Sequence, residues 1–207
     1  RLANLLPLEE LVAVELGLSA DTEMADQLDE LHRFTFLSNS DAHSLGKIGR
    51  EYQKIRLLEP SFQEWKRALQ AVEGRKIVAN YGLNPRLGKY HRTRCADCQE
   101  PLKPNLPACP NCGSRRIVKG VLERIRELAS NETPTPPRPP YHYQVPLDFL
   151  PGLGPKTLQK LLDRVGTEMQ ILHQAPIEDI ETVAGQSIAQ MIDQARTGRL
   201  TLVEGGA

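Results

Sequence analysis

All four cysteines of the chain fall within one short window, as Cys95-x2-Cys98 and Cys109-x2-Cys112, and ten residues separate the two pairs. Each pair forms a tight turn, and two such turns together supply the four thiolates that tetrahedral Zn²⁺ prefers. Four protein ligands leave no open coordination position, so we expect a structural zinc and no catalysis at this metal. Two disulfides or an iron–sulfur cluster are the alternatives for this spacing.

The cysteines lie in the most basic part of a chain whose 26 Lys and Arg balance 26 Asp and Glu. Residues 86–126 carry ten basic and three acidic side chains, whereas residues 1–45 carry two basic and nine acidic ones. A basic block of this kind is the usual footprint of a phosphate-rich partner, and a solvated surface is the alternative. The basic side chains nearest the cysteines are Arg86, Lys89, Arg92, Arg94, Arg115, Arg116 and Lys119.

A second candidate site is the Asp-x-His formed by Asp41 and His43, which follows the strand-like run 34–38. Residues two apart in an extended backbone point to the same side, so both side chains can reach one cavity at the carboxyl end of a strand. A carboxylate and an imidazole suit Zn²⁺, Mn²⁺ or Mg²⁺ at a hydrolytic site. The alternative is a polar loop with a hydrogen-bonded histidine.

A third candidate site follows Pro146, where Gly152-Leu153-Gly154-Pro155-Lys156 has the pattern of a helix-hairpin-helix motif. The glycines permit a tight turn and a close approach to a phosphate. Pro155 suits the first helical position, where the free N–H groups and Lys156 attract the phosphate, and we expect Leu153 to anchor the turn in the apolar face. Residues 180–192 contain a weaker second copy, and paired motifs bind duplex backbone without reading sequence. A plain turn of a helical bundle is the alternative.

The elements that must position these sites begin with two β-prone runs, 11–15 and 34–38, on either side of a helix that Asp21 can cap. Strand, helix, strand favours an α/β fold. A later helix begins at Ser61, with Glu64 placed to complete a capping box and Gly74 placed to end it. Its apolar residues at helical spacing are Phe62, Trp65, Leu69 and Val72. Residues 119–130 predict a further helix.

Residues 131–140 contain five prolines, which fix an extended, semi-rigid backbone that cannot join a packed element. Beyond them the pattern predicts three or four short helices and no strand. We therefore expect an α/β segment at 1–84, a zinc-binding element with its helix at 85–130, a linker at 131–145 and a helical DNA-binding domain at 146–207.

Several of these strings together resemble one known family. Ser40-Asp-Ala-His-Ser44, followed by residues 47–51, resembles the last metal motif of the PHP (polymerase and histidinol phosphatase) superfamily. The order of this motif, a four-cysteine element and a helix-hairpin-helix resembles bacterial forms of the endonuclease Q family. Residues 13–21, 79–86 and 88–93 also look like that family, so the resemblance covers nearly the whole chain.

The resemblance implies the C-terminal part of a PHP-type (β/α)₇ barrel and a metal-dependent endonuclease that nicks DNA 5′ to deaminated or abasic nucleotides. Asp41 and His43 would be two ligands of its hydrolytic metals, with Lys47 and Arg50 placed to hold substrate phosphates. Glu15 ends the preceding strand. We do not assign it as a metal ligand, because a helix cap or a salt bridge accounts for a glutamate at this position equally well.

The chain departs from the family's pattern in one respect. Such barrels open with a His-x-His, and no two histidines of this chain have that spacing; the five are His32, His43, His91, His142 and His173. Two protein ligands alone cannot align a water for attack on a phosphodiester. We therefore expect this chain to be the C-terminal, zinc- and DNA-binding part of a nuclease, inactive by itself.

Recognition of a damaged base would require its extrusion from the stack. The candidate stacking groups are Tyr81, Tyr90, Tyr141 and Tyr143. The alternative function is a non-enzymatic DNA-binding module that tethers a repair or helicase activity; a small-molecule phosphatase is a third and weaker one. No apolar run is long enough to span a membrane. The four-cysteine site and the lack of a recognisable secretion signal lead us to expect the reducing cytoplasm. The pattern says nothing of protein partners.

Overall fold

A computed structural model of the chain describes residues 11–130 and 132–202. They form two compact units, one that ends at His142 and one that runs from Tyr143 to Leu202. No helix among the described residues is both long and apolar enough to cross a membrane.

The first unit opens with two parallel strands, β1 (Ala13–Glu15) and β2 (Thr35–Leu37), which pair directly in register. Between them lie helix α1 (Thr22–Ala25) and a 3₁₀ turn at Asp29–Leu31. The Asp21 carboxylate accepts a hydrogen bond from the amide of Met24 at 2.9 Å, so the predicted cap is confirmed. Both predicted strands and the α/β character of this segment are confirmed as well.

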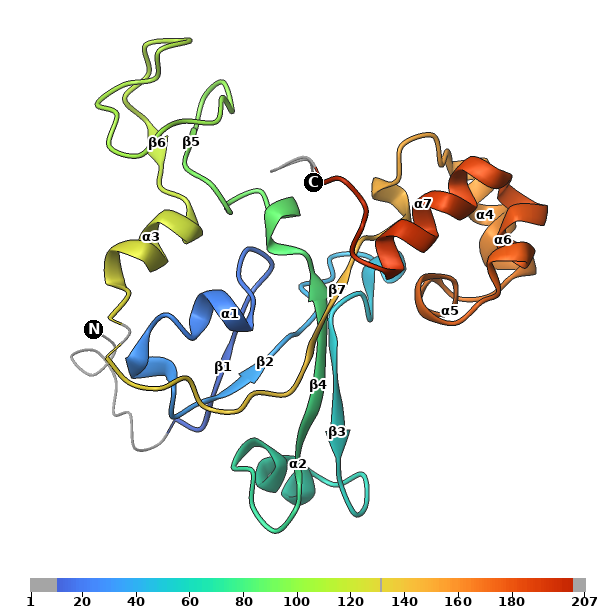
Figure 1. The fold of residues 1–207 in the computed structure, drawn as a ribbon, viewed down its shortest axis with the longest axis horizontal. Coiled ribbons are helices and arrows are strands. Elements are labelled where there is room, and N and C mark those ends of the chain that lie inside the picture. Colours follow the sequence, from blue (N-terminus) through green and yellow to red (C-terminus); the bar gives the residue numbers. More distant parts are fainter. Residues whose placement is uncertain (1–10, 131, 203–207) are drawn as a thin grey trace. The chain divides into compact units, whose positions relative to one another are not determined.

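A three-stranded sheet follows in the order β3 (Tyr52–Arg56), β4 (Lys76–Leu83), β7 (Tyr141–Gln144), with β3 and β4 antiparallel (Figure 1). A 3₁₀ turn at Leu45–Lys47 precedes β3, and another at Pro85–Leu87 follows β4. The buried Asn80 of β4 connects this sheet to β2, because its amide donates to the carbonyl of Phe36 at 3.1 Å.

Helix α2 (Phe62–Leu69) begins where the sequence predicts, since the Ser61 hydroxyl accepts from the amide of Glu64 at 3.3 Å. The predicted apolar face is buried only at Leu69: Phe62 is 70% exposed and Trp65 39% exposed, and the other buried residues of the helix are Glu64 and Ala68. The Glu64 carboxylate does not complete the expected capping box. It accepts instead from the Leu58 amide and from two arginines, and these bonds turn the polar residue inward. The helix ends before Gln70, ahead of Gly74.

The cysteine element consists of two short antiparallel strands, β5 (Arg94–Cys95) and β6 (Ile117–Val118), followed by helix α3 (Val121–Leu128). The predicted helix over 119–130 is therefore confirmed with slightly shorter bounds. Ile125 of α3 packs with Ala20 and Met24 of the α1 region into one small hydrophobic core. That packing fixes the position of the helix that carries the cysteine element.

The proline-rich stretch forms no helix or strand at 132–140, in keeping with its composition. It is nevertheless held against the first unit through Arg138, whose side chain is 12% exposed and pairs with Asp26. The expectation that these residues join no packed element is therefore wrong at Arg138, because a long cationic side chain can be buried where proline backbones cannot pair.

The second unit consists of a 3₁₀ turn at Leu147–Phe149 and four helices: α4 (Pro155–Arg164), α5 (Glu168–His173), α6 (Ile177–Ala184) and α7 (Gln186–Arg196). Its core is formed by fully buried aliphatic side chains, which are Leu147, Leu161, Ile171, Ile180 and Ile192. The expectation of no strand beyond residue 140 is wrong at Tyr141–Gln144, because this segment pairs with β4 as strand β7. From Val145 to Leu202 the described residues form short helices and no strand, as expected. The chain is thus a mixed α/β protein with an added helical unit.

Candidate functional site

The four cysteine sulfurs gather in one cluster, all within 4.8 Å of one another. The sulfur of Cys95 lies 3.6 Å from that of Cys112, and Cys98 lies 3.5 Å from Cys109, so all four thiols are free of disulfides. A tetrahedral ion with metal–sulfur bonds of about 2.3 Å holds its sulfurs roughly 3.8 Å apart. The cluster therefore fits one four-coordinate metal ion, and the predicted metal site is confirmed at that level.

Two matching turns build the cluster. The amide of Gln99 donates to the Cys95 carbonyl at 3.1 Å, and the amide of Gly113 donates to the Cys109 carbonyl at 2.9 Å. Both residues have positive φ, 62° at Gln99 and 74° at Gly113. The left-handed residue ends each C-x2-C turn and directs its two sulfurs to one point, which is easy for glycine and strained for glutamine.

The surroundings of the cluster shift the pKa values of two thiols, Cys95 and Cys112, in opposite directions. Hydrogen bonds from the Cys98 and Asp97 amides lower the pKa of Cys95 to about 7, with burial acting in the opposite direction. The Ser114 amide lowers the pKa of Cys112, but the neighbouring sulfurs of Cys98 and Cys95 outweigh it and raise that pKa to about 12. The raised pKa of Cys112 disfavours its thiolate beside the other sulfurs, and a bound divalent cation would supply the positive charge that stabilises it.

Helix α3 holds the cysteine element through the buried carboxylate of Glu123. This carboxylate accepts from Arg92 Nε at 2.6 Å and from the Thr93 amide at 3.0 Å, just before the first cysteine. Burial raises the pKa of Glu123, but the Arg92 and Thr93 hydrogen bonds lower it below its ordinary value overall. Gly120 makes room for this contact, because a Cβ there would lie 2.1 Å from Glu123 Oε2 and 2.4 Å from the Arg92 carbonyl carbon.

Several of the basic side chains around the cysteines form ion pairs. Arg92 pairs with Glu123 at 2.6 Å, Arg116 with Asp97 at 2.7 Å and Lys119 with Glu127 at 2.7 Å. Two further cations of this basic stretch, Lys89 and Arg115, are exposed. The positive charge available to a phosphate backbone is therefore smaller than the composition alone suggests.

Asp41 and His43 lie in the loop that follows β2, where the sequence places them. Their side chains are 73% and 82% exposed, and the closest carboxylate–imidazole distance is 4.0 Å. The His43 ring also bonds the Asp41 carbonyl at 2.8 Å. Among residues 11–130 and 132–202, the group of three or more potential metal ligands that lie close together is the four cysteines, and Asp41 and His43 are not part of it. Lys47 is exposed in the same loop and Arg50 is partly buried.

The carboxyl ends of β1 and β2 are joined by a chain of polar side chains that sequence reasoning missed. Asn39 donates to the Glu15 carboxylate at 3.0 Å and accepts from Gln53 of β3 at 2.7 Å. Glu15 therefore serves as a hydrogen-bond acceptor at this edge. No sequence pattern identified Asn39 or Gln53, since each is an ordinary polar residue until the strands bring them together.

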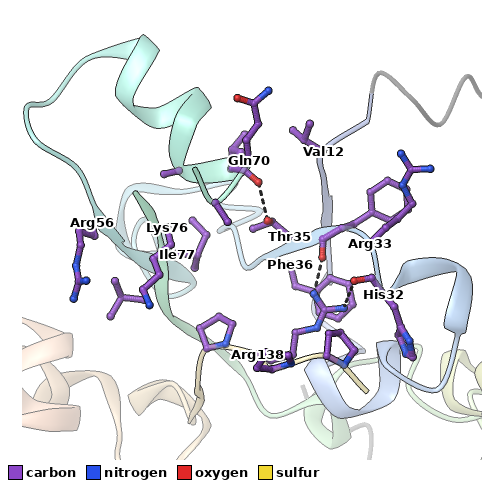
Figure 2. A pocket seen from close by; sticks show the side chains of 18 of the residues that line it. Val12, His32, Arg33, Thr35, Phe36, Arg56, Gln70, Lys76, Ile77 and Arg138 are labelled. Carbon is purple, nitrogen blue, oxygen red and sulfur yellow. Dashed lines mark hydrogen bonds between the residues drawn. The ribbon is translucent and has the colours of Figure 1, made fainter. Parts of the chain in front are cut away.

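A cavity of about 860 Å³ lies at the other end of β2. It is lined by Phe34, by Thr35 and Phe36 of β2, by Ile77 of β4 and by the prolines near Arg138. Figure 2 shows Arg56 and Lys76 together on one side of it and His32 and Arg33 on the other. Because active sites of α/β folds form at the carboxyl ends of parallel strands, this position argues against a reaction here.

The predicted glycine turn precedes α4 in the second unit. Gly152 has φ of 81°, the Leu153 side chain is 7% exposed, and Gly154 is the N-cap of a helix whose first residue is Pro155. A Cβ on Gly152 or Gly154 would meet no atom within 4 Å, so the space over the turn is open. Exposed Lys156 lies in the first turn of the helix.

A second, similar turn lies between α6 and α7, where the single residue Gly185 joins the two helices with φ of 85°. It falls within the predicted second copy. Here the first turn of the following helix carries Gln186 in place of a lysine. Both turns therefore contain a glycine with positive φ before a helix, but they differ in charge, because Lys156 follows the first turn and Gln186 the second.

The tyrosines named from the sequence have different surroundings. Tyr81 stacks on Tyr52 with ring centroids 4.4 Å apart and on His142 at 4.5 Å, which makes a three-ring ladder across the sheet. Tyr141 is largely buried, and burial raises its pKa to about 12. Tyr90 and Tyr143 are exposed, at 51% and 42%.

Comparisons with known proteins identify related sequences and structures, although no family model matches the chain. The uncharacterized protein YqxK of Bacillus subtilis is 51% identical over 194 residues, covering 94% of this chain and 50% of YqxK. The uncharacterized protein MJ0043 of Methanocaldococcus jannaschii is 38% identical over 216 residues, covering 93% of this chain and 27% of that protein. The chain thus spans half or less of these relatives.

Two solved structures match 95% of the chain, and both represent one class of protein, the DNA endonucleases that act at lesions. The lesion-specific endonuclease PfuEndoQ of Pyrococcus furiosus is 37% identical with a TM-score of 0.78. Endonuclease Q in complex with a 27-mer duplex substrate, with an abasic lesion at its active site, is 36% identical with a TM-score of 0.83. Over 95% of its length the chain is similar to endonuclease Q, so the predicted resemblance to that family is confirmed. The chain covers 53% and 54% of those two chains.

Proposed function

We propose that this chain is the C-terminal, DNA-binding part of a metal-dependent DNA-repair endonuclease that nicks DNA 5′ to deaminated or abasic nucleotides. The observation that carries the proposal is the likeness, over 95% of the chain, to endonuclease Q bound to a duplex with an abasic lesion. In this proposal β1 and β2 are the end of a PHP-type barrel, and the second unit is a helix-hairpin-helix domain. DNA is the partner of both units.

The proposal divides the chemistry among three places. Asp41 and His43 would hold barrel metals such as Zn²⁺, Mn²⁺ or Mg²⁺, which supply a hydroxide from bound water and stabilise the leaving oxyanion. Lys47 and Arg50, in the same loop, would hold the substrate phosphate. The four cysteines would bind one structural Zn²⁺, which keeps the basic element folded in a reducing compartment such as the cytoplasm.

Duplex DNA would be held without base readout at the turn before α4. The open space over Gly152 and Gly154 allows a phosphate to approach the positive end of that helix. Lys156 would add a full positive charge at the same point. Contacts of this kind set the position of the protein on the duplex and carry no sequence information.

We further propose that this chain does not cleave DNA by itself. Its Asp41 and His43 are highly exposed, and two protein ligands leave most coordination positions of a metal to water. The same exposure favours the second candidate function, a non-enzymatic module that brings another repair or helicase activity to DNA.

One experiment separates the two functions. The chain alone, and the chain fused behind a PHP segment that carries a His-x-His, are each incubated with Mn²⁺ and a duplex containing one deoxyuridine or abasic site. We expect a nick 5′ to the lesion with the fusion only, and its loss in Asp41→Asn with DNA binding retained. A fusion that binds the duplex but never nicks it would instead support the module.

A further inference from the structure

A buried carboxylate connects the cysteine element to helix α3. The Glu123 side chain is 5% exposed and accepts from Arg92 Nε at 2.6 Å, from the Thr93 amide at 3.0 Å and from the Thr93 hydroxyl at 3.2 Å. The Thr93 hydroxyl accepts in turn from the amide of Gly120, the N-cap of α3, at 3.0 Å. Each of these partners of the carboxylate is a donor, so the contact requires a group that only accepts.

This contact lies two residues before the first cysteine. Thr93 directly precedes β5, and the partner strand β6 leads through Gly120 into α3. Backbone hydrogen bonds from the amides of residues 121 and 122 to the carbonyls of residues 90 and 91, at 2.9 and 3.1 Å, join the same two stretches. The path of the backbone into Cys95 is therefore fixed against the start of α3.

The other side of α3 packs on α1. Ile125 is two residues beyond Glu123, which places the two side chains about 200° apart around the helix. Ile125 is 8% exposed and shares a hydrophobic core with Ala20 and Met24. Helix α3 therefore contacts the cysteine element through Glu123 and the helix between β1 and β2 through Ile125.

We propose that Glu123 is a positioning residue that links metal binding at the four cysteines to the stability of the α1–α3 core. Because metal ligands are ordered by folding, the free energy of metal binding adds to the stability of the folded protein, and the linkage is reciprocal. The Glu123 contact orders the strand of Cys95 in advance and so raises the affinity for the metal. When the cysteines are metal-bound, the same contact holds α3 on α1. This inference rests on the structural metal of the proposed function.

The test variant is Glu123→Gln, which keeps the shape of the side chain but replaces one acceptor oxygen with an NH₂ group. That group faces the donors of Arg92 and Thr93, so part of the contact is lost. The matched control is Glu127→Gln on the same helix, because Glu127 is 37% exposed and forms ion pairs at the surface. Arg92→Met, at a side chain that is 38% exposed, replaces the test variant if Glu123→Gln does not fold.

Two quantities are measured on the whole chain well below its melting temperature. Zinc affinity is obtained by competition with a coloured chelator, and hydrogen exchange of residues 20–28 is followed by mass spectrometry with and without zinc. Glu123→Gln should still bind about one zinc, but roughly tenfold more weakly, within the usual range of coupling between two sites. Removal of zinc should speed the exchange of residues 20–28 in the wild type and in Glu127→Gln, and should leave it unchanged in Glu123→Gln.

Three results would overturn the linkage. They are an unchanged zinc affinity in Glu123→Gln, an exchange of residues 20–28 in the wild type that does not respond to zinc, and an equal effect of Glu127→Gln. If the wild-type chain holds one zinc and any of these results is found, the linkage fails while the metal site stands. If the wild-type chain binds no zinc, both fail together.

Discussion

Arg138 and Asp26 form a two-point ion pair between residues 112 positions apart, with Arg138 Nη2 2.8 Å and Nε 3.0 Å from the same carboxylate oxygen. The guanidinium also lies 3.7 Å from the ring centroid of Phe36 and donates to the carbonyl of Phe34 at 2.6 Å. Through this one side chain the proline-rich stretch is fastened across α1 and β2. The stretch is therefore part of the first unit's fold around residue 138.

Replacing Arg138 with methionine should destabilise the first unit by about 3 kcal/mol, because the Asp26 carboxylate stays buried without its partner. Urea unfolding followed by the emission of Trp65, the single tryptophan, measures this change. Adding Asp26→Asn should restore part of the loss. Arg124→Met, which breaks the exposed pair with Glu127 in the same unit, is the control and should cost less than about 1 kcal/mol. A loss below 1 kcal/mol for Arg138→Met would contradict the role given to this pair.

Glu64 should make stability depend on pH in the acid range. Hydrogen bonds from the Arg75 guanidinium, the Leu58 amide and the Arg67 guanidinium lower the pKa of Glu64 from 4.5 to about 2. A lowered folded-state pKa gives stability that is present above pH 4.5 and is lost as the pH falls towards 2. The melting temperature of Glu64→Gln should therefore lie below the wild type at pH 7, and the gap should close between about pH 4.5 and 2.

A gap in melting temperature that stays constant from pH 7 to about pH 2.5 would show that Glu64 acts through shape and not through its charge. Glu59→Gln provides the comparison, since Glu59 is exposed and precedes the same helix. Its melting temperature should follow the wild type at every pH.

The cysteine cluster should hold one metal ion. Plasma emission on the purified chain is expected to give about one zinc per chain, lost in Cys95→Ser and retained in His43→Ala. Removing the zinc with a chelator should lower the melting temperature. Two or more tightly held ions, with the excess lost in His43→Ala, would contradict this account because they would show that the Asp41 loop assembles a metal centre unaided.

The turn before α4 gives a prediction about DNA affinity. Gly152→Ala strains a residue with φ of 81°, and Lys156→Ala removes one cation. Together they should weaken duplex binding roughly tenfold and reduce the slope of log affinity against log salt by about one. Lys66→Ala, on exposed α2, is a charge-matched control that should change neither quantity. Unchanged binding in the double variant would remove this turn from the interface.

What the sequence predicts well is what neighbouring residues determine. Asp21 and Ser61 cap their helices, the strands at 11–15 and 34–38 form, and the C-x2-C turns bring four sulfurs together because each device acts over a few residues. The wrong predictions depend on distant partners. Periodicity could not show that Arg75 would draw Glu64 inward and leave Phe62 exposed, or that Arg138 would find Asp26.

The residues of the candidate site show the same difference between local patterns, which the sequence reveals, and distant contacts, which it does not. Asp41 and His43 were found because two residues in one loop share a pattern. The polar chain through Asn39 was not, since Glu15 and Gln53 come from different strands and meet only in the fold. The exposure of Leu45 likewise could not be predicted, because the residue type alone does not show whether a leucine is exposed on a loop or buried in a core.

The most direct test of the account is the binding of this chain to a short fluorescent duplex with one abasic site, measured by anisotropy at rising salt. We predict saturable binding that weakens roughly 40-fold between about 50 and 200 mM salt, as expected for about three phosphate contacts. Tighter binding to the abasic duplex than to an undamaged one should accompany it. Absence of duplex binding at about 50 mM salt, by a folded chain that carries its metal, would contradict the central claim.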